Sequence, residues 1–136
     1  MRILKYVAAF FAMAVAASAS PTSEIEALLH YVAGLDGASF VRNGTDHTPA
    51  EAEAHLRLKW TRQMSEVVTA EDFIRLCGTK STMSGQPYMI RFKDGHEEES
   101  AQVILKQLDA IRSKSKKQAS PAQAPPPAQP VPNGMP

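Results

Sequence analysis

The chain has 136 residues and a formal net charge of +1, so its overall charge favours neither nucleic acid nor an acidic target. We therefore expect no nucleic-acid partner. Cys77 is the only cysteine, which excludes an intramolecular disulfide. A domain of this size folds on a thin margin of stability, and here the hydrophobic core must supply that margin without a covalent link.

Residues 1–19 have the pattern of a secretory signal peptide. Arg2 and Lys5 precede an apolar run over residues 6–16, and Ala17-Ser18-Ala19 provides the small residues of a cleavage site. The apolar run is shorter than the roughly 20 residues that cross a bilayer. Since no cysteine follows it to carry a lipid, we expect an exported protein without a stable membrane anchor after cleavage.

The exported chain is expected to begin with a helix and a hairpin. Ser23 followed by Glu26 has the capping-box pattern, and apolar residues then recur at helical spacing as far as Leu35. Asn43-Gly44 is a favoured centre for a tight hairpin, because both positions of that turn need positive φ. The short strand-like segments on either side of this pair predict a small antiparallel hairpin.

The second helix has the clearest start signal in the sequence. Thr48 can cap it, Pro49 suits its first position, and Glu51 can reach back to the amide of Thr48. We expect this helix to end near residues 64–67. Residues at four-residue steps along one side are expected to be buried: Ala52, Leu56, Trp60 and Met64.

The remaining predicted elements are a short helix, a strand and a last helix. Thr69 and Asp72 predict a helix that ends at Gly78 and buries Cys77 as a small apolar residue. Residues 87–92 have strand character, and a helix is expected from Glu97, where three acidic residues suit the positive end of the helix dipole. The order helix, hairpin, helix, helix, strand, helix predicts a small single α+β domain over residues 20–112, in which helices cover a small antiparallel sheet.

Residues 113–136 are expected to lie outside this domain. They hold seven of the ten prolines and begin with three lysines, Lys114, Lys116 and Lys117. This composition predicts a disordered, basic and proline-rich tail of semi-extended polyproline II character. The tail is either a solvated linker or a contact to an anionic polymer or lipid head group of the envelope.

Three ionisable residues, Glu51, His55 and Lys59, follow the border of the buried face of the second helix. Ordinary i,i+4 pairing is one explanation for this ladder, and one wall of a binding cleft is another. His47, Glu51 and His55 are spaced by four residues and are weak candidates for a metal site. The weakness is that His47 precedes the capping residue and need not point the same way.

A small hydrolase or metal-dependent enzyme is the alternative to a binding protein. It would use His55 as general base, Glu51 to orient the imidazole, and Ser81 or Ser84 as nucleophile. The sequence contains no triad signature that brings these residues together.

Arg42 and Arg91 lie in two predicted strand segments. If those strands pair, the two guanidinium groups could lie close together and suit a carboxylate or phosphate. The alternative is that both arginines are exposed and pair with Glu51, Glu71 or Asp72.

Four segments in this order, FVRNG, EAEAHLRLKW, TAEDFI and SGQPYMIR, resemble a domain-of-unknown-function family of small exported proteins of Gram-negative bacteria. The resemblance covers residues 24–112 and implies a periplasmic location, but no reaction, ligand or catalytic residue. It also implies that Cys77 is the remnant of a disulfide, if similar sequences have a second cysteine where this chain has Ala38 or Pro49. The motif positions are Arg42, Asn43, Gly44, Glu51, His55, Lys59, Trp60, Asp72, Ser84, Gly85, Pro87, Tyr88 and Arg91.

We therefore expect a non-catalytic periplasmic binding or accessory module of the cell envelope, without a cofactor. Its partner would be an envelope protein or a cell-wall component that the tail helps to reach. The candidate binding residues come from the hairpin, the ladder and the segment around residue 88: Arg42, Asn43, His55, Lys59, Ser84, Tyr88 and Arg91.

Overall fold

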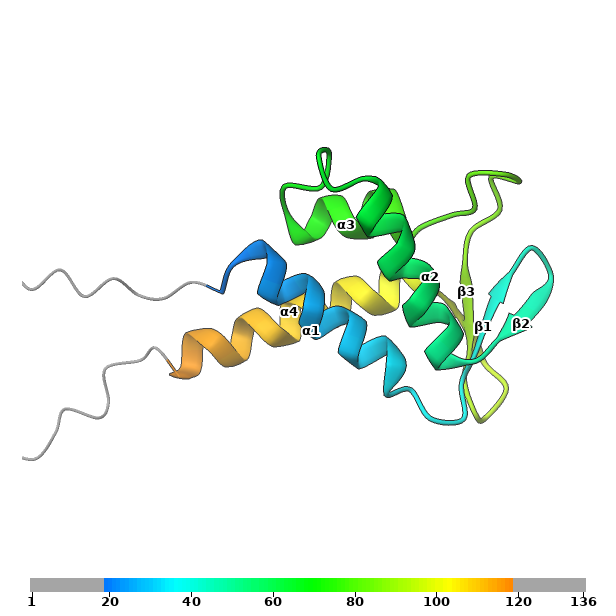
Figure 1. Ribbon diagram of the computed structural model, residues 1–136. Coiled ribbons are helices and arrows are strands. Elements are labelled where there is room, and N and C mark those ends of the chain that lie inside the picture. Colours follow the sequence, from blue (N-terminus) through cyan, green and yellow to red (C-terminus); the bar gives the residue numbers. More distant parts are fainter. Residues whose placement is uncertain (1–18, 119–136) are drawn as a thin grey trace, which may run out of the picture.

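The computed structural model describes residues 19–118, which form four helices and a four-stranded antiparallel sheet (Figure 1). The helices are α1 (Pro21–Ala33), α2 (Pro49–Arg62), α3 (Ala70–Cys77) and α4 (Ser100–Gln118). The strands are β1 (Ser39–Arg42), β2 (Thr45–His47), β3 (Met89–Arg91) and β4 (Glu97–Glu99). The predicted α+β class is confirmed. Apart from Ala19, the expected signal peptide lies outside the described residues, as does the tail beyond residue 118.

The strand order of the sheet is β2-β1-β3-β4, so β1 and β3 lie at the centre. Phe40 stands opposite Ile90 in the register of these two strands, and both side chains are buried. Their face of the sheet is therefore the inner one, which packs against the helices. Figure 1 shows the sheet at one end of the molecule, with α1 and α4 side by side and extending away from it.

The core lies among the helices and against the inner face of the sheet. Fully buried aliphatic and aromatic side chains fill it, including Leu28 of α1, Phe73 of α3 and Ile104 of α4. Burying each such side chain contributes about 1.5–3 kcal/mol to folding. The predicted buried face of α3 is confirmed: Ala70, Phe73, Ile74 and Cys77.

The hairpin and two capping boxes are confirmed. Asn43 and Gly44 both have positive φ, 51° and 76°, as the turn between β1 and β2 requires. Thr48 caps α2 and Thr69 caps α3, each in a reciprocal capping box with the side chain three residues later. Both helix starts are thus set by residues that are adjacent in the sequence.

The predicted cap of α1 is wrong. Ser20 caps this helix, because its Oγ accepts a hydrogen bond from the N–H of Ser23 at 3.2 Å and Pro21 takes the first helical position. Glu26 bonds to Arg57 of α2 instead of closing a capping box. The earlier start reflects the fixed φ of proline, which is already helical.

The predicted buried stripe of α2 is wrong at its end. Ala52 and Leu56 are buried, but Met64 lies beyond the helix and is 62% exposed, whereas Lys59 is 7% exposed. Steps of four residues drift around the helix by about 40° each, and a step of seven returns nearly to the starting face. Lys59, seven residues after Ala52, therefore occupies the core position that the four-residue steps assign to Trp60.

Glu97–Glu99 form the edge strand β4, not the first turn of the last helix. After the turn at Asp94 and Gly95 the chain returns alongside β3, and Arg91 pairs with Glu97 in the register. The backbone groups of β3 find partners in this way, which outweighs the preference of acidic residues for a helix start. The sheet thus has one strand more than predicted, and α4 begins at Ser100.

The last helix, α4, continues beyond residue 112, through residues 113–118, where the tail was expected to begin. The hydroxyl of Ser115 donates to the carbonyl oxygen of Ile111 within this last part. No proline occurs between Pro87 and Pro121, and basic side chains suit the negative end of the helix dipole. Lys114, Lys116 and Lys117 therefore belong to the helix and not to the tail.

Candidate functional site

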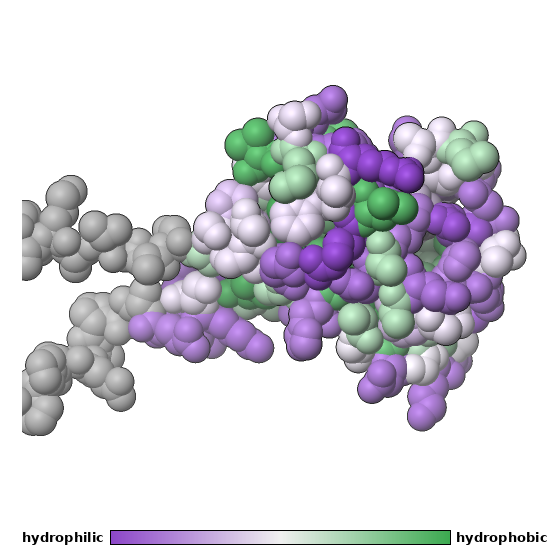
Figure 2. Space-filling model, viewed as in Figure 1, coloured by the Kyte–Doolittle hydropathy of each residue, from purple (hydrophilic) through white to green (hydrophobic). Residues whose placement is uncertain are grey.

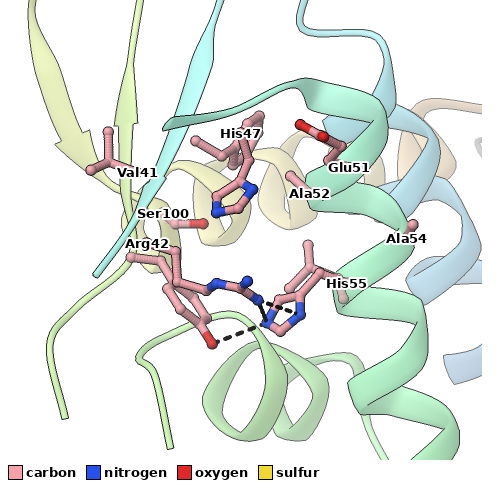
Figure 3. A pocket seen from close by; sticks show the side chains of 11 residues that line it. Val41, Arg42, His47, Glu51, Ala52, Ala54, His55 and Ser100 are labelled. Atoms are coloured by element: carbon pink, nitrogen blue, oxygen red, sulfur yellow. Dashed lines mark hydrogen bonds between the residues drawn. The ribbon is translucent and has the colours of Figure 1, made fainter. Parts of the chain in front are cut away.

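A pocket of about 310 Å³ lies between the inner face of the β1–β2 hairpin and α2 (Figure 3). Its apolar side is formed by Phe40 of β1 and by Ala52 and Leu56, which share one face of α2. Its polar lining residues are Arg42, His47, Glu51, His55, Tyr88 and Ser100. Figure 2 shows a hollow beside α2 on the side of the sheet, with hydrophilic residues over most of its rim.

His55 is the central polar residue of the pocket wall. Nη1 of Arg42 lies 2.7 Å from its Nδ1 and 3.0 Å from its Nε2, and the hydroxyl oxygen of Tyr88 lies 3.2 Å from Nε2. Because arginine can only donate, the nearer ring nitrogen accepts and the imidazole is neutral. Burial, followed by the positive charges of Arg42 and other basic groups, lowers the pKa of His55 to about 4. The ring therefore stays an acceptor at neutral pH.

Lys59 is a buried lysine behind this wall. Its Nζ donates to the hydroxyl of Tyr88 at 3.2 Å and to the carbonyl oxygen of Lys80 at 3.3 Å. The same Nζ lies 5.2 Å from the centroid of the Tyr88 ring, within the range of a cation–π contact. Arg42, His55, Tyr88 and Lys59 thus form one continuous chain of contacts, which we call the Tyr88 network.

The Tyr88 network carries positive charge without an acidic partner. Within residues 19–118, neither Arg42 nor Lys59 forms a salt bridge with a carboxylate. Buried charges in proteins are normally paired, because removing an unpaired charge from water is costly. In the same part of the chain, Arg62, Lys80 and Lys93 form no salt bridge either but are exposed to solvent, whereas Arg42 is partly buried and Lys59 is buried.

The side chain of Glu51 forms part of the capping box at the start of α2. Its Oε2 accepts a hydrogen bond from the N–H of Thr48 at 2.7 Å, and its own N–H donates to Oγ1 of Thr48 at 3.2 Å. The bond from the Thr48 backbone is the main reason why the pKa of Glu51 lies below its usual value. Among the hydrogen bonds of residues 19–118, none joins Glu51 to His55.

The candidates for a metal site line the same pocket without forming a metal-binding group. His47, Glu51 and His55 are all lining residues. Across residues 19–118, however, no three His, Cys, Asp or Glu side chains are arranged to hold a metal ion. The spacing of four residues brings the three side chains to one pocket, but the capping bond turns Glu51 toward Thr48.

Asn43, Ser81 and Ser84 form what we call the hairpin clasp, between the hairpin tip and the loop after α3. Nδ2 of Asn43 donates to Oγ of Ser81 at 3.3 Å, and the hydroxyl of Ser84 donates to Oδ1 of Asn43. Neither Asn43 nor Ser84 lines the pocket, although both were candidate binding residues. They join the hairpin to the loop that leads to Tyr88.

The parts of the hypothetical catalytic triad lie in three separate groups. Glu51 belongs to the cap of α2, His55 to the Tyr88 network, and Ser81 and Ser84 to the hairpin clasp. Within the described residues, His55 contacts Arg42 and Tyr88 and neither serine. The geometry therefore gives the hydrolase hypothesis no assembled nucleophile and base.

Of the two arrangements considered for Arg42 and Arg91, a common site and separate exposed positions, the structure does not show the common site. The register of β1 and β3 places Arg91 opposite Ser39, three residues from Arg42, and an odd separation puts the two side chains on opposite faces of the sheet. Arg91 bonds to Asp46 at 2.7 Å and to Glu97 at 2.8 Å on the outer face. Only Arg42 reaches the pocket.

Sequence reasoning does not find the apolar side of the pocket. Phe40 and Leu56 look like ordinary core residues, and Ser100 lies in a segment that was expected to be helical throughout. The one signal in the sequence is Ala52, a small residue within an apolar stripe, where a larger side chain would fill the space. Four candidate residues from distant segments do meet in the Tyr88 network: Arg42, His55, Lys59 and Tyr88.

Within the part of the chain that the structure describes, none of the helices combines the length and the apolar character of a membrane span.

Comparison with known proteins places residues 19–112 in one family. A family model described as a family of unknown function, DUF5329, matches residues 19–112. An uncharacterised protein of Salmonella typhimurium strain LT2, YfeK, is 38% identical over 71 residues, which are 52% of this chain and 59% of that protein. The chain thus spans about three fifths of the length of the curated relative that it matches, and no solved structure matches it. Because the family model covers most of the chain, this protein belongs to the DUF5329 family of unknown function.

Proposed function

We propose that this protein is a non-catalytic binding module of the bacterial cell envelope, which holds a small molecule between the β1–β2 hairpin and α2. The observation that carries the proposal is the pocket of about 310 Å³ beside two uncompensated cations. Its size lies at the lower end of the roughly 300–1,000 Å³ that ligand pockets occupy. An apolar side with a few fixed polar groups is the usual composition of such a site.

Binding explains the polar residues better than catalysis does. A general base works best when its pKa lies near the working pH, and the pKa of His55 is about 4. The imidazole is also held from two sides, by Arg42 and by Tyr88. Such a group fixes the position of its neighbours and is a weak base at neutral pH.

A periplasmic location completes the proposal. It is supported by the signal-peptide pattern of residues 1–19. In this compartment the pocket would meet metabolites of the envelope, and the proline-rich segment after α4 would contact an envelope protein or cell-wall component.

The first experiment asks whether the pocket retains a compound. The exported protein and its Ala52→Leu variant are incubated with a small-molecule extract of the envelope, freed of unbound solutes, denatured and analysed by mass spectrometry. We expect a compound that the wild type retains and the variant does not, because Ala52 lines the pocket and a larger side chain occupies it. Equal retention by the two folded proteins, or none by either, contradicts the proposal.

Turnover distinguishes binding from the enzyme alternative. The retained compound is recovered unchanged if the protein only binds it. A broad activity screen of the wild type beside His55→Ala completes this test, since an enzyme that uses His55 must show a turnover that the substitution abolishes.

The role of the tail is tested separately. Proteins captured from an envelope extract by the full exported chain are compared with those captured by a chain that ends at Gln118, the last residue of α4. Loss of a partner from the shorter chain supports a contact through residues 119–136. An unchanged set of partners removes that role from the proposal and leaves the pocket unaffected.

A further inference from the structure

We propose that the ligand of the pocket is an organic monocarboxylate, whose carboxylate binds Arg42 and whose apolar body lies against Phe40, Ala52 and Leu56. This inference rests on the proposed function and names the chemical class of its ligand.

Arg42 uses only one of its nitrogens within the protein. Nη1 contacts the ring of His55, whereas Nε and Nη2 form no hydrogen bond within residues 19–118. Figure 3 shows the guanidinium of Arg42 lying between the rings of His47 and His55 in the pocket wall. Nε and Nη2 share one edge of the guanidinium plane, and two parallel N–H groups on one edge match the two oxygens of a carboxylate. Because His55 holds Nη1, this edge is already positioned for an anion.

The charge around the pocket favours a ligand with one negative charge. The charged groups that influence His55 are all basic: Arg42, His47, Lys59 and Arg62. Glu51 is the acidic member of the described lining, and its exposed carboxylate is hydrogen-bonded to the N–H of Thr48. A monoanion balances the guanidinium of Arg42, which lines the pocket, whereas Lys59 lies behind the wall and does not line it.

A carboxylate fits this site better than a phosphate. Phosphate groups are commonly bound by the free backbone N–H groups at a helix start. The start of α2 lies next to the pocket, but Thr48 and Glu51 already occupy its cap through their side chains. Arg42 is thus left as the principal donor, and its one free edge satisfies two oxygens in a plane.

The apolar side of the pocket sets the size of the ligand body. A volume of about 310 Å³ holds on the order of ten non-hydrogen atoms at roughly 30 Å³ each, the share of a water molecule in the liquid. Phe40, Ala52 and Leu56 offer this body apolar contacts. A carboxylate with a short alkyl chain or a single aromatic ring therefore fills the site.

Hexanoate and hexanamide provide the direct test, because they share the alkyl chain and differ in charge. Binding to the exported protein is measured by titration calorimetry, and the site is located by amide chemical shifts. We expect hexanoate to bind at least about tenfold more tightly than hexanamide, since its hydrogen bonds to Arg42 are charge-assisted. The largest shifts should occur in β1 and α2.

Variants of Arg42 and Arg91 test whether the carboxylate of the ligand binds Arg42. In Arg42→Gln the preference for hexanoate over hexanamide should disappear. In Arg42→Lys the preference should fall, because lysine keeps the charge but lacks the two parallel N–H groups of the guanidinium. Arg91→Gln is the matched control, since Arg91 lies on the outer face of the sheet and bonds to Asp46 and Glu97. We expect this variant to bind hexanoate as the wild type does.

Several outcomes overturn the inference. If wild type binds hexanoate and hexanamide equally, or binds neither, the ligand is not a carboxylate of this kind. Retention of an envelope compound would still stand in that case, so failure here is distinct from failure of the proposed function. Competition by inorganic phosphate as strong as that by hexanoate would also overturn it, because the apolar body would then contribute nothing. Should Ala52→Leu not fold, the arginine variants decide the question, because Arg42 lies on the partly exposed wall.

Discussion

Arg112 and Arg42 are two partly buried arginines at opposite ends of the molecule, and only one of them is balanced by acids. Arg112 of α4 donates to Glu24 of α1 at 2.7 and 3.1 Å and to Glu71 of α3 at 3.2 Å. Arg42 of β1 contacts the neutral ring of His55 and pairs with no carboxylate within residues 19–118. The first charge joins three helices, whereas the second lines a pocket. Comparing the two separates a charge that holds the fold together from one that is available to a ligand.

The largest effect is expected from Arg112→Met, which should lower the free energy of unfolding by about 2 kcal/mol. The substitution leaves the carboxylate of Glu24, whose side chain is 9% exposed, without its partner. Hydrogen bonds to charged groups contribute about 1.5–3 kcal/mol, and an unpaired buried charge adds to the loss. Urea unfolding followed by circular dichroism measures this change.

Arg57→Met is the control for that prediction. Arg57 also bonds to two glutamates, Glu26 and Glu53, but its side chain is 45% exposed. An exposed cluster of this kind contributes less than about 1 kcal/mol. Equal losses from the two substitutions would show that burial of Glu24 does not matter.

In the Tyr88 network, Lys59→Met should raise the free energy of unfolding by about 1 kcal/mol. Methionine has a similar shape, and the substitution removes a buried ammonium whose hydrogen-bond partners in the described chain are neutral. The hydroxyl of Tyr88 keeps His55 as a partner. The same variant should bind hexanoate less tightly, because a positive charge near the pocket is lost.

Lys106→Met serves as the comparison, since Lys106 is exposed and pairs with Glu98 at 2.9 Å. We expect it to leave stability unchanged or slightly lower. If Lys59→Met instead lowers the free energy of unfolding by more than about 1 kcal/mol, Lys59 stabilises the fold, which contradicts the view that its buried charge is destabilising.

A further effect is a dependence on pH. The pKa of His55 is about 4 in the folded protein and about 6.5 in the unfolded chain, so the unfolded chain binds more protons between these values. His55 therefore lowers stability as the pH falls from 6.5 toward 4. In His55→Gln this part of the decline should disappear when urea midpoints are compared between pH 7 and pH 5.

His96 provides the opposite case. Asp94 raises its pKa, so its contribution to stability is present below the ordinary value and is lost as the pH rises through the raised one. His96→Gln should therefore remove stability at pH 5 and little at high pH. A similar pH profile in both variants would show that the two imidazoles do not differ in environment.

Local signals in the sequence were reliable where neighbouring residues decide the outcome. The Asn43-Gly44 turn and the caps at Thr48 and Thr69 involve residues at most three apart, and the structure confirms all three. The buried face of α3 was equally predictable from its spacing. These features follow from backbone geometry and from hydrogen bonds that each segment can form alone.

The errors arose where tertiary contacts overrule a local preference. Glu97–Glu99 suit a helix start, but β3 offers them a strand partner, and Ser23 has a capping pattern that Ser20 and Pro21 pre-empt. Lys59 looks like a surface residue of an ordinary i,i+4 ladder until the Tyr88 hydroxyl and the Lys80 carbonyl oxygen are brought to it. The edge strand and Lys59 thus depend on contacts outside their own segments, whereas the start of α1 was decided by Ser20 and Pro21, close neighbours of Ser23.

By itself, the sequence determined the α+β class, the hairpin turn, the starts of α2 and α3, the core face of α3, and four residues that do meet at the site. Only the tertiary structure decided that Arg42 and Arg91 lie on opposite faces of the sheet, that Asn43 and Ser84 bond to each other, and that a pocket exists. The reason is physical. Helix starts and tight turns are set within a few residues, whereas strand register, charge compensation and empty volume depend on which distant segments pack together.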